Sequence, residues 1–195
     1  MEERLAGVRQ FDEAAMLEEA LALFWRQGAA ATSMLDLAAA TGVQRGSLYN
    51  AYGDKEAIFL RAFDLYAARF LDGAGASLEG GDAGLVLRRF FDTVIANMTS
   101  GTPARGCLTT KTAGDGSLAS ERIKEKLGGF LDRLAAIVEA ALSRPAIRAG
   151  LALEPAQAAM VVVTFTRGLA VMERVHGDRT ALARAADGLI RALVR

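Results

Sequence analysis

Two short segments separated by a glycine-containing turn constrain this chain more than any other feature. The first runs from Ser33 to Gly42, and the second runs from about Arg45 to Ala51. Ser33 and Asp36 are spaced as a helix N-terminus requires, because each side chain can accept a hydrogen bond from the other residue's backbone amide. Glycine favours the left-handed backbone that ends a helix. The spacing predicts a helix-turn-helix, the motif whose second helix can enter the major groove of DNA.

The rest of the chain also shows helical periodicity. From Asp12 to Gln27 apolar side chains recur at i, i+3, i+4 and i+7, and a longer segment that ends near Ser143 does the same. The glycine-rich stretch from Gly73 to Gly84 is expected to be a loose connection between helices. No segment shows the alternation typical of a β-strand. We therefore predict an all-α chain of about nine helices.

Composition limits the compartment and the partners. Hydrophobic residues make up 52% of the chain, which implies extensive burial. The single cysteine, Cys107, cannot form an internal disulfide, which fits a reducing cytoplasm. The N-terminus lacks the features of a signal peptide, and the strictly apolar runs fall far short of the ~20 residues that cross a bilayer. We expect a soluble, cytoplasmic protein.

Net charge does not support nucleic-acid binding. The 23 basic and 23 acidic residues cancel, and residues 1–55 hold five basic and eight acidic side chains. A DNA-binding surface usually leaves a basic footprint. A DNA-binding role must therefore rest on the side chains that the second helix turns outward.

The register of the helix-turn-helix separates its inward and outward residues. The side chains expected to pack inward are Leu37, Ala38, Val43, Leu48 and Tyr52. Those expected to face outward are Gln44, Arg45, Ser47, Tyr49 and Asn50. The outward set suits phosphates and base edges. A purely structural helical hairpin would show the same inward pattern, so both interpretations stay open on spacing alone.

The stretch from Phe24 to Glu56 resembles the DNA-binding domain of the TetR/AcrR family of regulators. The matching residues are Phe24, Gly28, Thr32-Ser33, Leu37-Ala38, Gly42-Val43, Gly46-Ser47-Leu48-Tyr49, Tyr52 and Lys55-Glu56. Beyond that stretch the layout agrees: a long seventh helix and a final helix pair. Arg105-Gly106-Cys107-Leu108 also looks like a subgroup signature at the start of helix six.

The resemblance implies a ligand-responsive transcriptional repressor, not an enzyme, that binds palindromic operator DNA as a homodimer. Residues 1–55 would form the helix-turn-helix DNA-binding domain, and residues 56–195 would bind the ligand and dimerise. Ser33, Tyr49 and Lys55 would contact phosphates. Gln44, Arg45 and Ser47 would face the groove, with Arg45 the candidate for guanine readout. Asn50 completes the expected DNA-binding set, although it is small where the family often has a larger residue.

The final two helices, at about residues 155–176 and 178–194, would form the dimer. Their apolar residues look too many to bury within one protomer: Met160, Val161, Val162, Val163, Phe165 and the stripe Leu182, Leu189 and Leu193. Helix four is expected to be the only element that contacts both the DNA-binding head and the effector pocket.

The resemblance also implies an effector cavity among helices four to eight. The candidate lining residues are Phe63, Tyr66, Phe90, Val94, Met98, Cys107, Phe130, Phe165 and Met172. The same aromatic and methionine stripes fit a plain helical core equally well. We expect no cofactor and no metal site, because the chain has one cysteine and one histidine. That histidine, His176, fits a partner for a helix C-terminus.

Cys107 has two interpretations. It precedes the expected sixth helix, with Lys111 one turn later, and both a helix N-terminus and a nearby cation favour the thiolate. Similar regulators with this signature include sensors of electrophiles and oxidants. The alternative is a small packing residue. A rival class of protein, an enzyme or carrier that uses Cys107 as a nucleophile, lacks a nearby base in the sequence.

Overall fold

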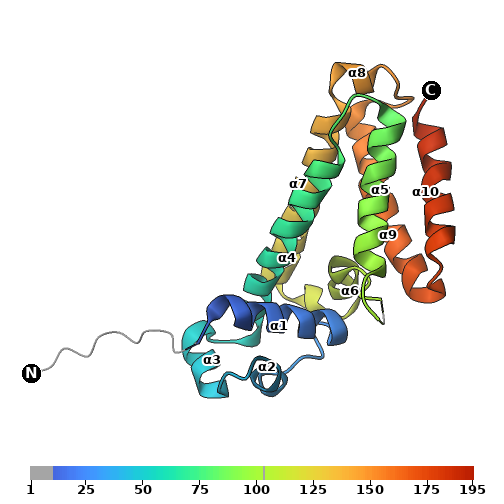
Figure 1. Ribbon diagram of the computed structural model, residues 1–195. Helices are drawn as coiled ribbons and strands as arrows, with labels where there is room; N and C mark the ends of the chain where they lie inside the picture. Colours follow the sequence, from blue (N-terminus) through green and yellow to red (C-terminus); the bar gives the residue numbers. More distant parts are fainter. Residues whose placement is uncertain (1–10, 103) are drawn as a thin grey trace, which may run out of the picture.

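The structure is a computed structural model and describes residues 11–102 and 104–195. Figure 1 shows a small helical head below a taller helical body. The head consists of α1 (Glu13–Gln27), α2 (Met34–Thr41) and α3 (Arg45–Tyr52). The helices of the body are α4 (Lys55–Ser77), α5 (Ala83–Thr99), α6 (Leu108–Gly114), α7 (Glu121–Leu142), α8 (Pro145–Arg148), α9 (Pro155–His176) and α10 (Arg179–Leu193), with a 3-10 turn at Ser117–Ala119.

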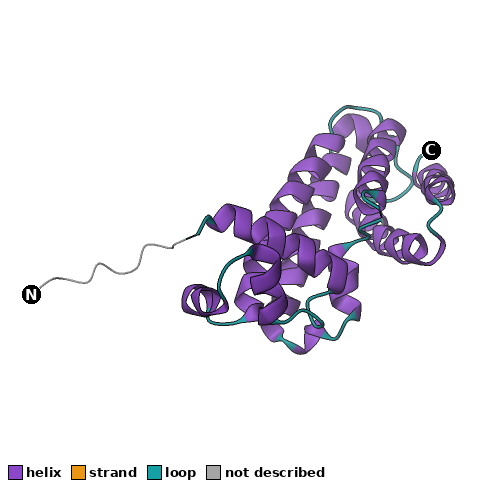
Figure 2. Ribbon diagram, turned by 60° about the horizontal axis from the view of Figure 1, so that its bottom comes forward, coloured by secondary structure: helices purple, strands orange, loops and turns teal. Residues whose placement is uncertain are grey.

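The all-α prediction is confirmed for the part of the chain that the structure describes. Helices and loops account for everything drawn in colour in Figure 2, and only an isolated bridge pairs Leu151 with Val194. The described residues form one helix more than the expected nine, because Pro145–Arg148 forms a single helical turn. A four-residue helix is too short to show a periodic pattern in the sequence.

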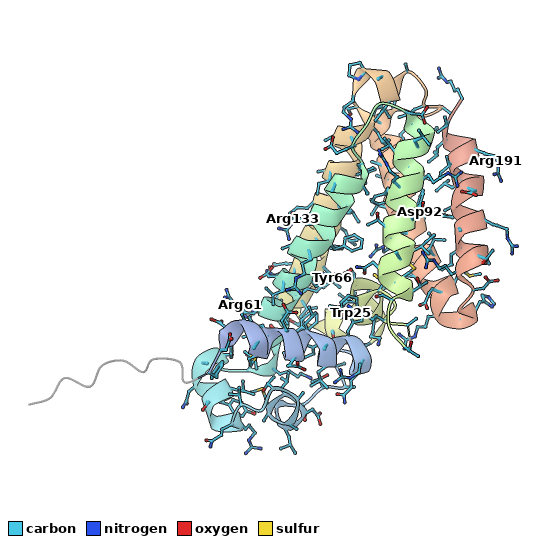
Figure 3. All side chains as sticks on the ribbon, viewed as in Figure 1. Trp25, Arg61, Tyr66, Asp92, Arg133 and Arg191 are labelled. Carbon is cyan, nitrogen blue, oxygen red and sulfur yellow. The ribbon has the colours of Figure 1, made fainter. Side chains whose placement is uncertain are left out.

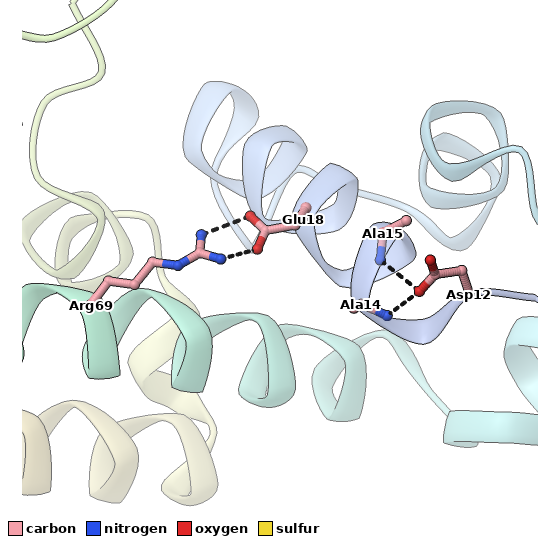
Figure 4. Close-up of polar contacts among 5 residues, drawn as sticks. All are labelled: Asp12, Ala14, Ala15, Glu18 and Arg69. Carbon is pink, nitrogen blue, oxygen red and sulfur yellow. Dashed lines mark hydrogen bonds and ion pairs between the residues drawn. The ribbon is translucent and has the colours of Figure 1, made fainter.

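Helix termini follow local capping chemistry. Ser33 and Asp36 form the expected reciprocal box: the Asp36 amide donates to Ser33 Oγ at 3.1 Å, and the Ser33 amide donates to Asp36 Oδ2 at 2.9 Å. Asp12 Oδ1 accepts from the Ala14 and Ala15 amides at the start of α1 (Figure 4). These bonds satisfy amides that have no partner within the helix.

The expected loose connection at Gly73–Gly84 is wrong at its start. Helix α4 continues through Gly73 and Gly75 to Ser77. A glycine inside a helix costs about 1 kcal/mol relative to alanine. Ala74 and Leu78 are buried on this segment, and their burial offsets part of that cost.

The core runs without interruption from head to body along α4. Phe24 of α1 meets Phe59 edge-on, with ring centroids 5.2 Å apart. Trp25 of α1 meets Tyr66 in the same way, also at 5.2 Å, where the head joins the body (Figure 3). Head and body are therefore packed together by aromatic contacts along α4.

Ion pairs reinforce this joint at the surface. Arg69 of α4 forms a two-pronged pair with Glu18 of α1, in which Nη1 lies 2.8 Å from Oε2 (Figure 4). Arg61 of α4 reaches Glu13 at 3.6 Å. Arginine and carboxylate match each other's planar geometry, so the pair fixes orientation more than it adds stability.

Candidate DNA-binding face and effector cavity

The helix-turn-helix has the inward packing that its register predicts. Leu37 and Leu48 are fully buried, and Ala38, Val43 and Tyr52 pack against the same core. Gly42 turns the chain with φ 68°, a conformation that costs glycine little and other residues more.

The outward side chains of α3 are available for a ligand. Gln44, Arg45, Tyr49 and Asn50 are exposed, and Ser47 is half-buried. Gln44 precedes the helix without a side-chain capping bond, so its amide group is not used by the protein's own backbone there. The face thus presents amide, guanidinium and phenol groups, which suit base edges and phosphates.

Ser33 and Lys55 are already engaged within the protein. The Ser33 hydroxyl donates to Asp36 Oδ2 at 2.7 Å. This bond and the bond from the Ser33 amide hold the pKa of the Asp36 carboxyl below its ordinary value. Lys55 Nζ, in the first turn of α4, donates to the Ala30 carbonyl at 3.0 Å. A DNA phosphate would have to share these groups with their present partners.

Most of the predicted effector residues lie in the packed core. The six that are buried are Phe63, Tyr66, Phe90, Val94, Met98 and Phe130. Their rings contact one another, as in the Phe63–Phe130 pair with centroids 5.7 Å apart. Phe165 is half-buried against Phe91, and Met172 is 49% exposed on α9.

A cavity of about 1230 Å³ lies where the head meets the body. Four segments enclose it: the end of α1, the loop before α6, α6 itself and the last turns of α9. Figure 1 shows α6 near α1 and the lower part of α9. Of the nine predicted lining residues, Cys107 alone lines this cavity. The others that do so include Trp25, Arg26, Arg105, Gly106, Thr110, Lys111, Asp115, Ala170, Val171, Glu173, Arg174 and Val175.

Cys107 occupies the N-cap position of α6 and is half-buried. Arg167 Nη1 donates to Cys107 Sγ at 3.3 Å, and the Tyr66 hydroxyl lies 4.0 Å from the sulfur. Burial raises the pKa of the thiol, but the Arg167 guanidinium, the Thr110 amide and the Tyr66 hydroxyl together outweigh burial, so the pKa is lowered. Thiolate character is therefore favoured at this position.

The cation that acts on Cys107 is not the expected one. Lys111 extends away to α1, where Nζ donates to the carbonyls of Trp25 and Arg26, the latter at 3.0 Å. Arg167, which is 60 residues from Cys107 in sequence, supplies the positive charge instead. Sequence proximity indicated Lys111, but its long side chain finds the unpaired carbonyls at the end of α1.

Helix α6 joins the cavity to the head, so the expectation that helix four alone does so is wrong. Asp115 Oδ2 accepts from the Ala30 amide at 3.2 Å, in the turn that leads to α2. Trp25 Nε1 donates to the Gly106 carbonyl at 3.2 Å. Together with Lys111, these bonds tie α6 and its preceding loop to the end of α1.

An apolar stripe on α9 is left exposed by the described part of the chain. The stripe comprises Met160, Val161, Val171, Met172 and Val175, all exposed. Helix α9 is also long and apolar enough to cross a membrane by length and composition alone, with 44% of its apolar window buried.

The other residues expected at the dimer face lie mostly inside. Leu182 and Leu193 of α10 are buried, as are Val162 and Val163 of α9. Leu189 and Phe165 pack against the core. The expectation that one protomer cannot bury all of the predicted apolar set holds for Met160 and Val161, which are exposed. The apolar side of α10 packs on α5 and α9.

The described residues offer no evident metal centre. In residues 11–102 and 104–195, no three His, Cys, Asp or Glu side chains are grouped so as to hold a metal ion. His176 is exposed at the last turn of α9.

A helix-turn-helix with an outward second helix, carried on a larger helical body, defines the class of DNA-binding transcriptional regulators. This chain belongs to the TetR family. The model for "Bacterial regulatory proteins, tetR family" matches residues 16–62, and that for "Tetracyclin repressor-like, C-terminal domain" matches residues 86–189.

Known proteins agree with this assignment. The HTH-type transcriptional repressor ComR of Escherichia coli (strain K12) is 33% identical over 117 residues, which cover 56% of each chain. The match thus spans just over half of that relative. A CifR cysteine mutant complexed with 26-bp double-strand operator DNA has a TM-score of 0.85 at 25% identity, covering 95% of this chain and 99% of that one. Reduced NemR of E. coli shares the fold, with a TM-score of 0.80 at 19% identity over 92% of this chain and 97% of that one.

Proposed function

We propose that this protein is a cytoplasmic, homodimeric repressor that binds a palindromic operator and releases it when an apolar or electrophilic effector acts at Cys107. One observation carries the effector part: the Cys107 sulfur lies 3.3 Å from Arg167 and lines a cavity that α6 connects to the DNA-binding head. The operator complex of CifR supports the DNA-binding part.

The DNA-binding face would be built from α3 and the helix starts beside it. Arg45 would read a guanine, while Gln44, Ser47 and Asn50 would line the groove. Ser33, Tyr49 and Lys55 would contact phosphates and so fix the register. Two such faces, about one helical turn or ~34 Å apart, would match a palindromic site.

The α9 stripe supports the dimer. Met160 is 71% exposed at one end of the stripe and Val175 is 68% exposed at the other, so the apolar surface extends along the helix. A second copy would cover it by placing its own α9 against the same residues, as two-fold interfaces do. We propose that α10 flanks this contact through its outer side.

Release would begin at α6. An electrophile that bonds to Cys107 adds volume at the first turn of α6 and removes the negative charge that Arg167 stabilises. Lys111 and Asp115 would pass the displacement to the end of α1. Release requires only that the modified protein favour head positions that no longer match the operator spacing.

An electrophoretic shift assay tests both parts. Purified protein is mixed with duplex from its own upstream DNA, then treated with N-ethylmaleimide, in parallel with Cys107→Ser. We expect both proteins to form a shifted protein–DNA complex. N-ethylmaleimide should dissociate the wild-type complex and leave the Cys107→Ser complex intact. If both proteins release the DNA alike, the thiol is not the sensor, and if no shift forms, the operator assignment is wrong.

The rival class, an enzyme or carrier using Cys107, gains little support from the geometry. A cysteine nucleophile is activated by an adjacent general base or by a lowered pKa, and turnover also needs a side chain that moves protons. The groups that act on the sulfur belong to Arg167, Thr110 and Tyr66, and none of them is a general base such as His, Asp or Glu. Burial raises the pKa of the Tyr66 hydroxyl above its ordinary value, so the hydroxyl stays protonated.

A further inference from the structure

Positive side chains outnumber negative ones around the cavity beside Cys107. Four cationic residues and two acidic residues line it: Arg26, Arg105, Lys111 and Arg174 against Asp115 and Glu173. The excess matters because charges that line a hollow with low-dielectric walls focus their potential into it.

Asp115 and Lys111 are hydrogen-bonded to backbone groups and Glu173 is buried, so the exposed charges of the cavity wall are those of the arginines. Asp115 accepts from the Ala30 amide at 3.2 Å and from the Ser117 amide at 3.0 Å. Glu173 is only 6% exposed. The Lys111 ammonium donates hydrogen bonds to the Trp25 and Arg26 carbonyls at the end of α1. Burial, and then the positive charge of Arg174, lower the pKa of Lys111.

The three guanidinium groups are open to a ligand. Arg26, Arg105 and Arg174 are exposed and have no ion-pair partner within the described part of the chain. Arg105 lies over the Trp25 ring, with Cζ 5.4 Å from the ring centroid. Guanidinium groups bind planar oxyanions through paired hydrogen bonds.

Apolar groups stand beside these cations. The Trp25 ring, Ala170 and Val171 belong to the same cavity wall. A ligand that satisfies both parts carries an anionic group and an apolar body. The charge pattern does not favour a cation or an uncharged hydrocarbon.

We propose that this cavity recognises organic anions, a carboxylate or sulfonate on an apolar body, and that an electrophile bearing such a group reaches Cys107 ahead of its neutral counterpart. The second part rests on the function proposed above for Cys107.

The test compares iodoacetate with iodoacetamide, which differ in charge but share the reacting carbon and the leaving group. In each case the thiolate attacks the CH₂ carbon, the C–S bond forms, and iodide leaves with the electron pair of the C–I bond. Cys107 is the only cysteine, so mass spectrometry of the intact protein reports one site. The ratio of the two rates, iodoacetate over iodoacetamide, is compared with the same ratio for N-acetylcysteine.

We expect the ratio for the folded protein to exceed that of N-acetylcysteine by roughly threefold or more, as electrostatic focusing predicts. In the double variant Arg105→Gln, Arg174→Gln the ratio should fall toward the reference. Arg191→Gln, on the exposed side of α10 and far from Trp25 (Figure 3), is the matched control and should leave it unchanged. Dividing by the iodoacetamide rate removes any change in thiol pKa.

A second probe tests binding without a covalent step. The aromatic sulfonate 8-anilinonaphthalene-1-sulfonate should bind several-fold more weakly to the double variant than to wild type or Arg191→Gln, as measured by fluorescence titration. The proposal is overturned if the protein shows no iodoacetate preference, or if neither probe responds to the double variant. If the protein prefers iodoacetate but alkylation does not release the DNA, the sensor function is refuted and anion selection stands. If alkylation releases the DNA but the protein shows no preference for iodoacetate, anion selection is refuted and the sensor function stands.

Discussion

The Lys111 ammonium of α6 donates a hydrogen bond across 3.0 Å to the carbonyl of Arg26 in the last turn of α1. Carbonyls in the last turn of a helix have no partner within that helix. Helix α6 therefore caps α1, and it does so from the segment that begins at Cys107. Together with α4, helix α6 thus holds the DNA-binding head against the body.

Replacing Lys111 by methionine should loosen the head. The substitution keeps the apolar stem but removes the donor, and a hydrogen bond to a charged group contributes about 1.5–3 kcal/mol. We expect faster amide exchange over residues 25–30 and weaker operator binding. Lys124→Met removes only an exposed pair with Glu121 on the same helix and is the control. Equal exchange in both variants would show that α6 does not hold α1.

Substitutions on the DNA-binding face should separate phosphate contacts from base contacts. Arg45→Ala should cost ~1–3 kcal/mol and relax base preference, whereas Lys55→Ala should lower the salt slope by about one. Tyr49→Ala should weaken binding to all sequences. Fluorescence anisotropy titrations of labelled operator DNA over a series of salt concentrations measure the affinity and the salt slope of each variant. Arg133→Ala, on α7 away from the head (Figure 3), should bind like wild type. Full-strength binding by all three test variants would remove α3 from the interface.

A charge in the α9 stripe should separate the protomers. Met160→Asp places a carboxylate on a side chain that is 71% exposed, so the protomer should fold while the dimer fails. Leu35→Asp makes the same kind of change at a 66% exposed position on α2 and should leave assembly intact. Sedimentation velocity at micromolar concentration distinguishes the two. A dimeric Met160→Asp protein would place the interface elsewhere.

Arg167→Met should make Cys107 less reactive at neutral pH. The thiolate is the reactive form, so the alkylation rate rises as pH passes through the thiol pKa. Arg167 lowers that pKa, and its loss should move the rate profile to higher pH. N-ethylmaleimide is too base-labile at high pH, so iodoacetamide is the reagent of choice. The two proteins should react at similar rates well above both pKa values, and superimposed profiles would remove Arg167 from this role.

Phe130→Ala should destabilise the fold strongly. Its ring contacts Phe63, Tyr66 and Phe70, with centroids 5.6–5.7 Å away. Truncating a fully buried phenylalanine typically costs about 3–5 kcal/mol. Urea denaturation measures the loss. A much smaller effect would mean that the site tolerates empty space, as the wall of an effector pocket would.

Local chemistry made part of this structure predictable. The caps at Asp12 and Ser33 and the inward register of Leu37 and Leu48 depend on neighbours within a few residues, so a sequence pattern reveals them. The same holds for the long periodic helices.

The cavity and the surroundings of Cys107 depend on contacts between residues far apart in the sequence, so no local pattern predicts them. The cavity draws on residues as far apart as Ala22 and Gly177, which no periodicity brings together. Arg167 and Lys111 are both basic, and only the folded chain determines which one reaches Cys107. The aromatic stripe fitted a core or a pocket equally well in sequence, because both need the same apolar residues.

Val171 and Val175 belong both to the exposed α9 stripe and to the cavity wall. Suppose that α9 forms the dimer interface proposed above and that a duplicated gene diverged until its product no longer paired with the parent protein. Substitutions at these positions would then also reshape the cavity. The same mutations would then stop the two paralogues from forming mixed dimers and change which ligand fits the cavity. Selection on partner choice could in this way produce a regulator with a new chemical specificity.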